Sequence, residues 1–570
     1  QRFVRWCRRR PVVVGLTACL VASMVVFGST TIYFAATSKQ TFSLVESERK
    51  QKDQNLEIAL FAVEQMVEQA ALLADVPRTE QKRVALLDQA RQFYQRFIGQ
   101  RPNDQDLKFE SARVLRTVGN VFRILDSFDE SKVAFDEAIE QLVRLRGDAP
   151  EDSRYIELLA KCRVDLCLLL RPLNYSLAFD EIEKAIVIYE DSFQATEPYR
   201  LAGFARALYI RGSLLSERGD LTASENDYLS AIEMLETMLH DDPQHSGENA
   251  QSDKVVLDLG KTLSLYGVLL QEVSRFEEAM SRYRHAIELL QPYVTLRDHR
   301  QVSAVIRNQL AITLSDLDRR ADAVDENANS IETLEDLARQ SPRNGTFKSE
   351  LANALLTRGR LMRDDGKLRE ARSFFDRADR LLQQLSVDFP GNQGYRNRIG
   401  NSHYELAFID VLEEDFESSV KKLREAIVLH EVCYGVNPSN QRFAADLRRS
   451  YALMIRSLLE LGDLVEMQHM MATCLRTFPQ DSELHLQTAK WRATAAERIR
   501  AKDDFPLTAA SRSEELPAQL IRETLLDLRR AFEIGESLDS VSDVVDMIKS
   551  FPSFANRDEF DRLLNDLRSK

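Results

Sequence analysis

The sequence has 570 residues, 44% of them hydrophobic, and glycine and proline are scarce at 20 and 15 residues. This composition favours helices over a sheet-rich fold, and the length exceeds what one globular core usually reaches. The net charge is −14, and five arginines among the first ten residues leave −19 for the remainder. Such an acidic chain is a poor general binder of nucleic acid, which is held through cation–phosphate contacts.

The N-terminal region predicts a membrane anchor. A basic stretch at residues 1–10 precedes residues 11–38, which carry no charged side chain and are long enough to span a bilayer as a helix. The positive-inside rule then places the N-terminus in the cytoplasm and the rest of the chain outside it. A cleaved signal peptide, or a lipoprotein signal ending at Cys19, is an alternative interpretation of the same segment.

Residues 39–75 predict one amphipathic helix. Its apolar residues recur at spacings of three and four, at Leu56, Leu60, Val63, Val67, Ala70 and Leu73. Two interpretations follow. The helix packs on the first repeat, or it forms a short coiled coil in a homodimer.

Internal repetition is the main signal in the sequence. A small residue is followed by small residues 12 and 19 positions later, at Gly119/Ser131/Ala138, Gly212/Ser224/Ala231, Gly267/Ala279/Ala286, Ala311/Ala323/Ser330, Gly359/Ala371/Ala378 and Ala407/Ser419/Ala426. A bulky residue often stands 16 positions after the first, as Phe135, Tyr228, Tyr283, Phe375 and Leu423, although Asn327 breaks the pattern. Small residues let two antiparallel helices approach, and the bulky one fills the space beside the contact.

Turn residues divide the repeat into helix pairs. The segments 217–220 and 364–367 each contain glycine between the two helices, and Pro243, Pro292, Pro342, Pro390, Pro438 and Pro479 follow the second helix. These offsets resemble the tetratricopeptide repeat, most clearly in residues 355–382. The family's period is about 34 residues, whereas Ala311, Gly359 and Ala407 are 48 apart, so we expect a longer second helix or following loop.

The predicted fold is therefore all-α: a tetratricopeptide-like helical-hairpin solenoid over residues 76–500, preceded by one transmembrane helix. A polar linker is expected at 501–516, and a C-terminal helical cap at 517–570.

Catalytic and metal-binding motifs are missing from the sequence. It contains no phosphate-binding glycine loop, no kinase catalytic loop, no HExxH and no GxSxG, so we expect no enzyme activity and no cofactor. The six cysteines, at 7, 19, 162, 167, 433 and 474, form no CxxC pair and indicate neither a disulfide framework nor a zinc module. His240 and His245 flank two aspartates, but we interpret them as polar loop residues.

A wider resemblance concerns the order of the parts. The RWCRRRP stretch at 5–11, the apolar run, the repeats and the ending with Phe560, Leu563, Leu564 and Leu567 resemble the C-terminal half of bacterial membrane-anchored serine/threonine kinases. The resemblance implies a bacterial inner-membrane protein with extracytoplasmic repeats. The kinase domain is absent from these 570 residues, so the chain would be a sensor or regulatory region. The leading prediction is a membrane-anchored protein–protein interaction scaffold.

A ligand groove is predicted on the first helices of the pairs, which line the concave face of such a superhelix. The exposed positions expected there are Arg113, Arg116, Arg123, Arg206, Lys261, Asn308, Asn353, Arg360, Arg363, Asn401, Arg449 and Arg456. We hypothesise that they bind an acidic peptide or a chain-terminal carboxylate. Alternatively, these arginines pair with Asp and Glu on adjacent helices.

Overall fold

The computed structural model describes residues 104–570 apart from short gaps, together with scattered residues before 104. The gaps are 125–127, 172–173, 192–197, 241–249, 343–344, 389–392, 439, 501–505, 509–510, 513–514, 552–556 and 569–570. Within the described residues, every regular element is helical. The all-α prediction is confirmed for this part of the chain.

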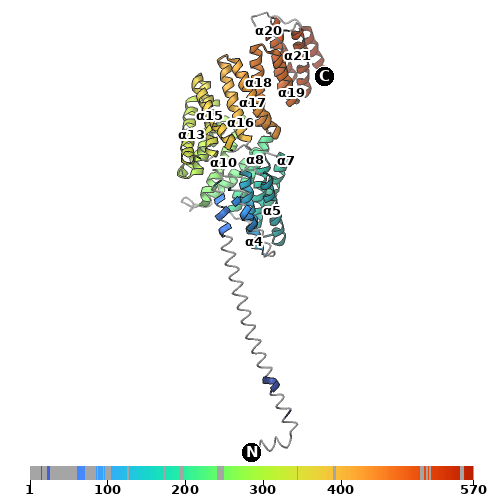
Figure 1. The fold of residues 1–570 in the computed structure, drawn as a ribbon. Coiled ribbons are helices and arrows are strands. Elements are labelled where there is room, and N and C mark those ends of the chain that lie inside the picture. The colour runs from blue at the N-terminus through green and yellow to red at the C-terminus, as the bar shows by residue number, and fades with distance from the viewer. Residues whose placement is uncertain are drawn as a thin grey trace, which may run out of the picture.

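The helices pack as consecutive antiparallel pairs that follow one another along a curved path (Figure 1). The pairs are α4 (Gln105–Ile124) with α5 (Phe128–Asp148), α6 (Ser153–Leu170) with α7 (Tyr175–Asp191), α8 (Pro198–Arg218) with α9 (Leu221–His240), α10 (Ala250–Glu272) with α11 (Phe276–Leu290), α12 (Arg297–Asp316) with α13 (Arg320–Gln340), α14 (Gly345–Asp364) with α15 (Leu368–Asp388), α16 (Gln393–Leu412) with α17 (Phe416–Val436), α18 (Gln441–Leu461) with α19 (Leu464–Thr477), and α20 (Ser482–Arg500) with α21 (Leu516–Ile534). A short 3₁₀ turn, η2 (Gln291–Tyr293), follows α11, and α22 (Leu538–Lys549) and α23 (Arg557–Arg568) end the chain. The first helix of each pair also contacts the first helix of the next, as expected for a tetratricopeptide-like superhelix.

Four pair interfaces are built from a glycine facing an aromatic ring, at Gly119/Phe135, Gly212/Tyr228, Gly267/Tyr283 and Gly359/Phe375. A Cβ atom added to Gly267 would lie 2.5 Å from the ring of Tyr283, and one added to Gly119 would lie 2.8 Å from the ring of Phe135. The Ser131 hydroxyl also donates to the Gly119 carbonyl at 2.7 Å. The predicted spacing therefore reflects direct contacts, in which any side chain larger than hydrogen would displace the ring.

The lapse at Asn327 has a structural explanation. Asn327 is fully buried, and its amide donates to the Asn308 side chain and to the Ala354 carbonyl, each at 3.0 Å. A polar contact thus replaces the aromatic ring in the pair formed by α12 and α13. Because Asn308 is also buried, its predicted exposure in the groove is wrong.

The extra length of each repeat is shared by both helices. Helices α14 and α16 have 20 residues each, and α15 and α17 have 21 each. The second helix is longer, as predicted, but the first helix is longer as well, which the sequence did not predict. Longer helices in both positions bury more apolar surface in each pair than a 34-residue unit would.

The turns inside the pairs share one backbone conformation. Gly219, Gly366 and Gly462 have φ of 87°, 74° and 68°, in the left-handed region that glycine adopts without steric cost. The corresponding turns of other pairs place Ser274, Asp318 and Glu414 there, with φ of 60°, 58° and 62°. The two turns predicted from glycine are confirmed, and the three others lack a sequence signature.

Apolar residues from the predicted helix at 39–75 contribute to the first part of the core. Val63, Val67 and Ala70 are buried in a cluster with Val118 and Phe122 of α4. This contact favours packing on the first repeat over a coiled coil. These three side chains are covered within one chain, so they offer no seam for the predicted homodimer.

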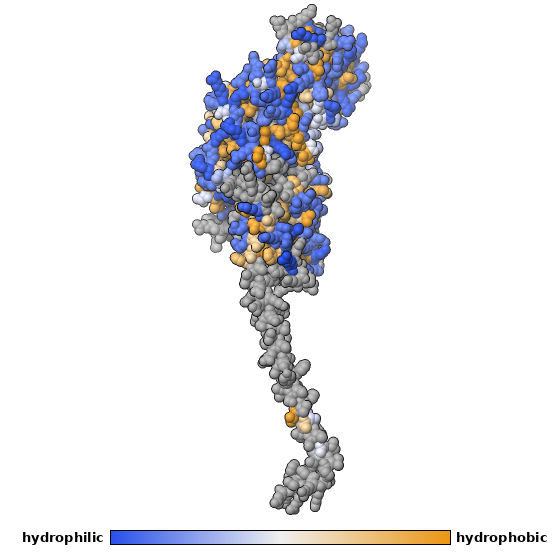
Figure 2. Space-filling view, viewed as in Figure 1, coloured by the Kyte–Doolittle hydropathy of each residue, from blue (hydrophilic) through white to orange (hydrophobic). Residues whose placement is uncertain are grey.

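The predicted membrane placement is corrected. Among the described residues, no helix combines the length and the apolar character needed to cross a bilayer, so a single-pass inner-membrane protein with extracytoplasmic repeats is not supported. The predicted span at 11–38 lies outside the described residues, except for residue 15 and residues 22–25. Figure 2 shows hydrophilic residues over most of the visible face of the repeats, with apolar residues between them.

The described residues after α20 pack against the preceding helices. Ser511 is buried, and its hydroxyl accepts from the Leu464 backbone N–H at 2.9 Å at the start of α19. The Thr508 N–H likewise donates to the Gly462 carbonyl at 3.2 Å. The described residues of the predicted linker therefore dock on the turn between α18 and α19. The apolar residues of the chain ending, Phe560, Leu563, Leu564 and Leu567, are the buried face of α23.

Candidate functional site

The predicted groove residues all lie on first helices, but they do not form one continuous strip. They separate into an N-terminal cluster on α4 and α8, which Asp165 of α6 joins, and a C-terminal cluster on α14, α16 and α18. Between the two, Asn308 is buried and Lys261 lies 3.7 Å from Asp258 on its own helix. Asn353, on α14, is half-buried.

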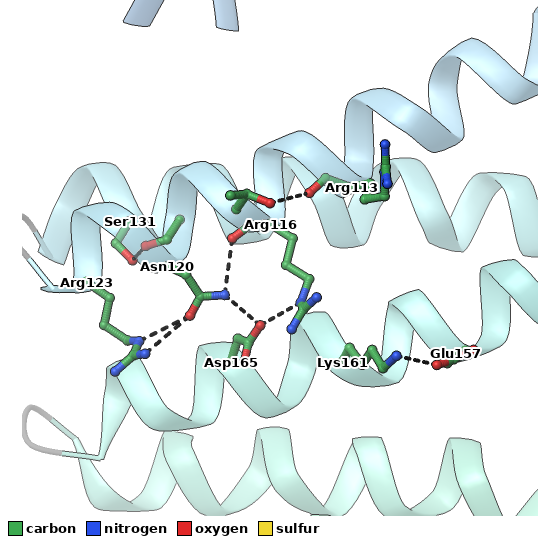
Figure 3. Close-up of polar contacts among 10 residues, drawn as sticks. Arg113, Arg116, Asn120, Arg123, Ser131, Glu157, Lys161 and Asp165 are labelled. Atoms are coloured by element: carbon green, nitrogen blue, oxygen red, sulfur yellow. Dashed lines mark hydrogen bonds and ion pairs between the residues drawn. The ribbon is translucent and has the colours of Figure 1, made fainter. Parts of the chain in front are cut away.

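The N-terminal cluster is centred on the buried carboxylate of Asp165. Arg116 Nε and Asn120 Nδ2, one turn apart on α4, both donate to Asp165 Oδ2 on α6, at 2.6 and 2.7 Å (Figure 3). Arg123 donates in turn to Asn120 Oδ1 at 3.3 and 3.4 Å. The chain of contacts joins two neighbouring first helices and fixes where the Arg116 and Arg123 guanidinium groups lie.

Cations outnumber carboxylates around Asp165. Partial burial lowers the pKa of Arg123, and the like charge of Arg206 on α8 adds to this effect, while Asp165 opposes it. Arg206 is exposed and makes no hydrogen bond or ion pair within the described residues. Two carboxylates, Asp165 and the more distant Asp258 of α10, thus lie near three arginines, and the Arg206 guanidinium keeps its donors for solvent or a ligand.

The C-terminal cluster begins with the buried carboxylate of Glu405 on α16. Arg360 Nε donates to Glu405 Oε1 at 2.6 Å, and Arg363 Nη1 pairs with Glu405 Oε2. The Arg363 guanidinium also lies over the Phe408 ring, 4.8 Å from its centroid. Arg360 and Arg363 are therefore both held by the next first helix, as the alternative interpretation of the sequence expected.

A second carboxylate, Asp446 on α18, organises the other half of this cluster. Asn397 and Asn401, one turn apart on α16, donate to Asp446 Oδ2 at 2.8 and 3.1 Å, and Arg449 pairs with Oδ1. Asn401 is buried, so its predicted exposure in the groove is wrong. Burial alone would raise the pKa of Asp446, but Arg449 and the Asn397 amide lower it overall. The carboxylate is therefore ionised in the folded protein and anchors Arg449 at the groove surface.

A buried histidine lies beneath Asp446. His430 of α17 has 1% of its surface exposed, and its Nδ1 lies 3.0 Å from the Ser450 hydroxyl. Among the described residues its Nε2 has no hydrogen-bond partner, and it would lie 2.5 Å from a Cβ added to Gly400. Burial lowers the pKa of His430 to about 4, so the ring is neutral at neutral pH.

The remaining predicted residues differ in how they are held. Arg113 is half-exposed and pairs with Glu110 on its own helix at 2.7 Å. Arg456 is exposed and, like Arg206, makes no hydrogen bond or ion pair within the described residues. Arg206 and Arg456 are therefore the two predicted arginines without a direct partner in that part of the chain.

The prediction missed the acids and amides that position the arginines, namely Asn120, Asp165, Asn397, Glu405 and Asp446. It also missed Arg398 and Arg442. The spacing contains a usable signal: Asn397, Asn401 and Glu405 recur every four residues on α16, and Arg442, Arg449 and Arg456 recur every seven on α18. Both spacings place polar residues on one helix face.

The described residues provide neither a metal site nor a reactive cysteine. No group of three or more His, Cys, Asp or Glu among them could hold a metal ion. His240 ends α9, and His245 lies outside the described residues. Burial raises the pKa of the thiols of Cys162, Cys167 and Cys474 to about 12 and that of Cys433 to about 11, so these cysteines are poor nucleophiles.

Comparison with known proteins finds solved structures with a similar fold but no protein related in sequence. No family model matches the chain, and no curated protein matches it. The apo form of RapI is 11% identical with a TM-score of 0.44, and a Rap protein complexed with competence and sporulation factor is 14% identical with a TM-score of 0.40; each match covers 75% of this chain and 99% of the other. A tetratricopeptide repeat protein from Parabacteroides merdae is 14% identical with a TM-score of 0.29, covering 58% of this chain and 98% of the other. These comparisons do not show the resemblance to membrane-anchored kinases.

Proposed function

We propose that this chain is a protein–protein interaction scaffold whose first helices bind an acidic segment of a partner protein. One observation supports this proposal: arginines gather on the inner face of a chain that is otherwise acidic. In the C-terminal cluster, five arginines face four carboxylates, the arginines being Arg360, Arg363, Arg398, Arg442 and Arg449 and the carboxylates Glu350, Asp364, Glu405 and Asp446. An excess of cations on a concave face attracts anionic partners.

The paired arginines suit recognition because they are held in place. Arg360 uses its Nε on Glu405, which leaves its terminal amino groups as further donors. A guanidinium already fixed by a buried carboxylate loses little side-chain entropy when a ligand binds. The buried acids therefore position the arginines, and the excess positive charge favours a carboxylate-bearing ligand.

The test uses arginines whose loss leaves the fold intact. Replacing Arg360 and Arg363 would leave the buried Glu405 unpaired, so these variants would mix a folding defect with a binding defect. Arg206 and Arg456 are free of such contacts within the described residues. The matched control removes two arginines from second helices, Arg144 and Arg339, whose side chains are 74% and 73% exposed.

Fluorescence anisotropy with a labelled glutamate-rich peptide, and with its glutamine counterpart, gives the readout. We expect wild type to bind the glutamate peptide more tightly than the glutamine peptide, with an affinity that falls as salt rises. The Arg206→Ser/Arg456→Ser variant should bind roughly tenfold more weakly, while Arg144→Ser/Arg339→Ser binds as wild type does. Equal losses in both variants, or equal binding of both peptides, would contradict the proposal.

A further inference from the structure

The floor of the C-terminal cluster is aromatic. Tyr404 and Phe408 stand one turn apart on α16, with ring centroids 6.3 Å apart, and both residues are half-buried. The Arg449 guanidinium of α18 lies over the first ring, 5.4 Å from the Tyr404 centroid. The Arg363 guanidinium of α14 lies over the second, 4.8 Å from the Phe408 centroid. Stacking uses the face of a guanidinium, so the two rings position these groups without occupying the N–H donors at their edges.

The Tyr404 hydroxyl is a donor without an internal partner among the described residues. By contrast, the hydroxyls of Tyr266 and Tyr283 donate to a glutamate and a glutamine side chain, at 2.7 and 2.6 Å. Burial raises the pKa of Tyr404, and the charge of Arg449 opposes this shift without reversing it, so the phenol keeps its proton at neutral pH. A phenylalanine, such as Phe408 one turn later, would provide the same ring. The fold therefore does not explain this hydroxyl.

The two buried carboxylates of this cluster already have their partners. Both oxygens of Glu405 are engaged by arginines of α14, and both oxygens of Asp446 are engaged by side chains of α16 and α18. Within the described residues, Arg360 keeps both terminal nitrogens, Arg449 keeps Nε and Nη1, and Tyr404 keeps its hydroxyl. The two arginine side chains are 34% and 49% exposed, so a ligand can reach them. A ligand that supplies oxygen acceptors fits this surplus of donors.

We infer that the Tyr404 hydroxyl donates a hydrogen bond to a carboxylate of the bound acidic segment, which makes Tyr404 a specificity-determining residue of the C-terminal cluster. This inference rests on the proposed function and adds the residue that reads the acid. Arg449, stacked on the same ring, supplies N–H groups and positive charge to the same carboxylate. A neutral amide oxygen accepts the phenol hydrogen bond more weakly than a carboxylate does, so the hydroxyl increases the preference for glutamate over glutamine.

Removal of one oxygen atom tests this role. Tyr404→Phe deletes the hydroxyl and keeps the ring under Arg449. Because the hydroxyl has no partner among the described residues, the variant should melt at the wild-type temperature. In the anisotropy assay it should bind the glutamate-rich peptide roughly tenfold more weakly and show a smaller preference for that peptide over its glutamine counterpart. Wild-type affinity, or a lower melting temperature that reveals a structural role for the hydroxyl, would overturn the inference.

Tyr434→Phe is the matched control. Tyr434 is also half-buried and its hydroxyl makes no hydrogen bond within the described residues, but it stands on the second helix α17, with its ring 5.2 Å from that of Phe478. This variant should bind both peptides as wild type does, and a loss equal to that of Tyr404→Phe would contradict the inference. If wild type binds neither peptide, or both equally, the proposed function fails as well. If Arg206→Ser/Arg456→Ser weakens binding and Tyr404→Phe does not, only the role of Tyr404 fails.

Discussion

The two sides of a first helix differ in how far their contacts repeat from one pair to the next. On α14, Gly359 packs under the Phe375 ring of its own pair, while the next residue, Arg360, reaches Glu405 of the neighbouring pair. Most pair interfaces repeat one apolar contact along the chain, in which a small residue packs against a large side chain. The inner face varies, with two polar clusters separated by the buried Asn308. The pair contacts and the inner-face contacts therefore lie on separate sides of the first helices, so substitutions can perturb one set without the other.

The largest effect is expected at a pair interface. Phe375→Ala removes a fully buried ring that fills the space over Gly359, and should lower the free energy of unfolding by about 3–5 kcal/mol. Denaturant unfolding followed by circular dichroism measures this loss. A loss below about 1 kcal/mol, the range of surface substitutions, would show that the pair interface does not carry the stability assigned to it.

The second effect is a dependence of the unfolding free energy on pH, caused by the buried His430. Burial keeps the pKa of His430 at about 4, below its ordinary value of 6.5, so the unfolded chain binds this proton first as pH falls. The stability from a neutral His430 is complete above about pH 6.5 and is lost as pH falls toward about 4, by about 3 kcal/mol in all. His430→Gln should flatten the curve of unfolding free energy in this window. If wild type and variant fall in parallel, the account of His430 is wrong.

A smaller effect is expected on the inner face. Glu405→Gln removes the ion-pair partner of Arg360 and one of the two carboxylates paired with Arg363, but both arginines remain partly solvated, so we expect a loss of about 1–3 kcal/mol. The same variant should keep or increase its affinity for the glutamate-rich peptide, because a negative charge has left the cluster. A weaker affinity at full folding would show that Glu405 positions the arginines more than it neutralises them.

The smallest effects are expected in the turns. Ser274, Asp318 and Glu414 adopt the left-handed backbone that Gly366 and Gly462 occupy in equivalent turns. Ser274→Gly and Glu414→Gly should each raise the free energy of unfolding by roughly 0.5–1 kcal/mol, since non-glycine residues are strained there. Gly366→Ser is the reciprocal control and should be destabilising. Unchanged melting temperatures in all three variants would show that these turns are relaxed.

The sequence predicted the pair interfaces better than the inner face. Offsets such as Gly359 to Phe375 follow from one contact repeated in each pair, so they are visible as periodicity. The partners of Arg116 and Arg360 are Asp165 and Glu405, which stand 49 and 45 positions further along the chain. Such distances depend on the helix lengths and the superhelical pitch, which the period alone did not give. The same limit applies to Asn308, whose burial depends on Asn327 of the next helix.

Hydrogen–deuterium exchange of the full chain with and without the glutamate-rich peptide tests most directly whether the first helices form the ligand-binding face. We predict that added protection falls on α8, α16 and α18, and that it disappears in the Arg206→Ser/Arg456→Ser variant. Protection concentrated on second helices such as α9 and α17, or protection that survives in this variant, would contradict the account.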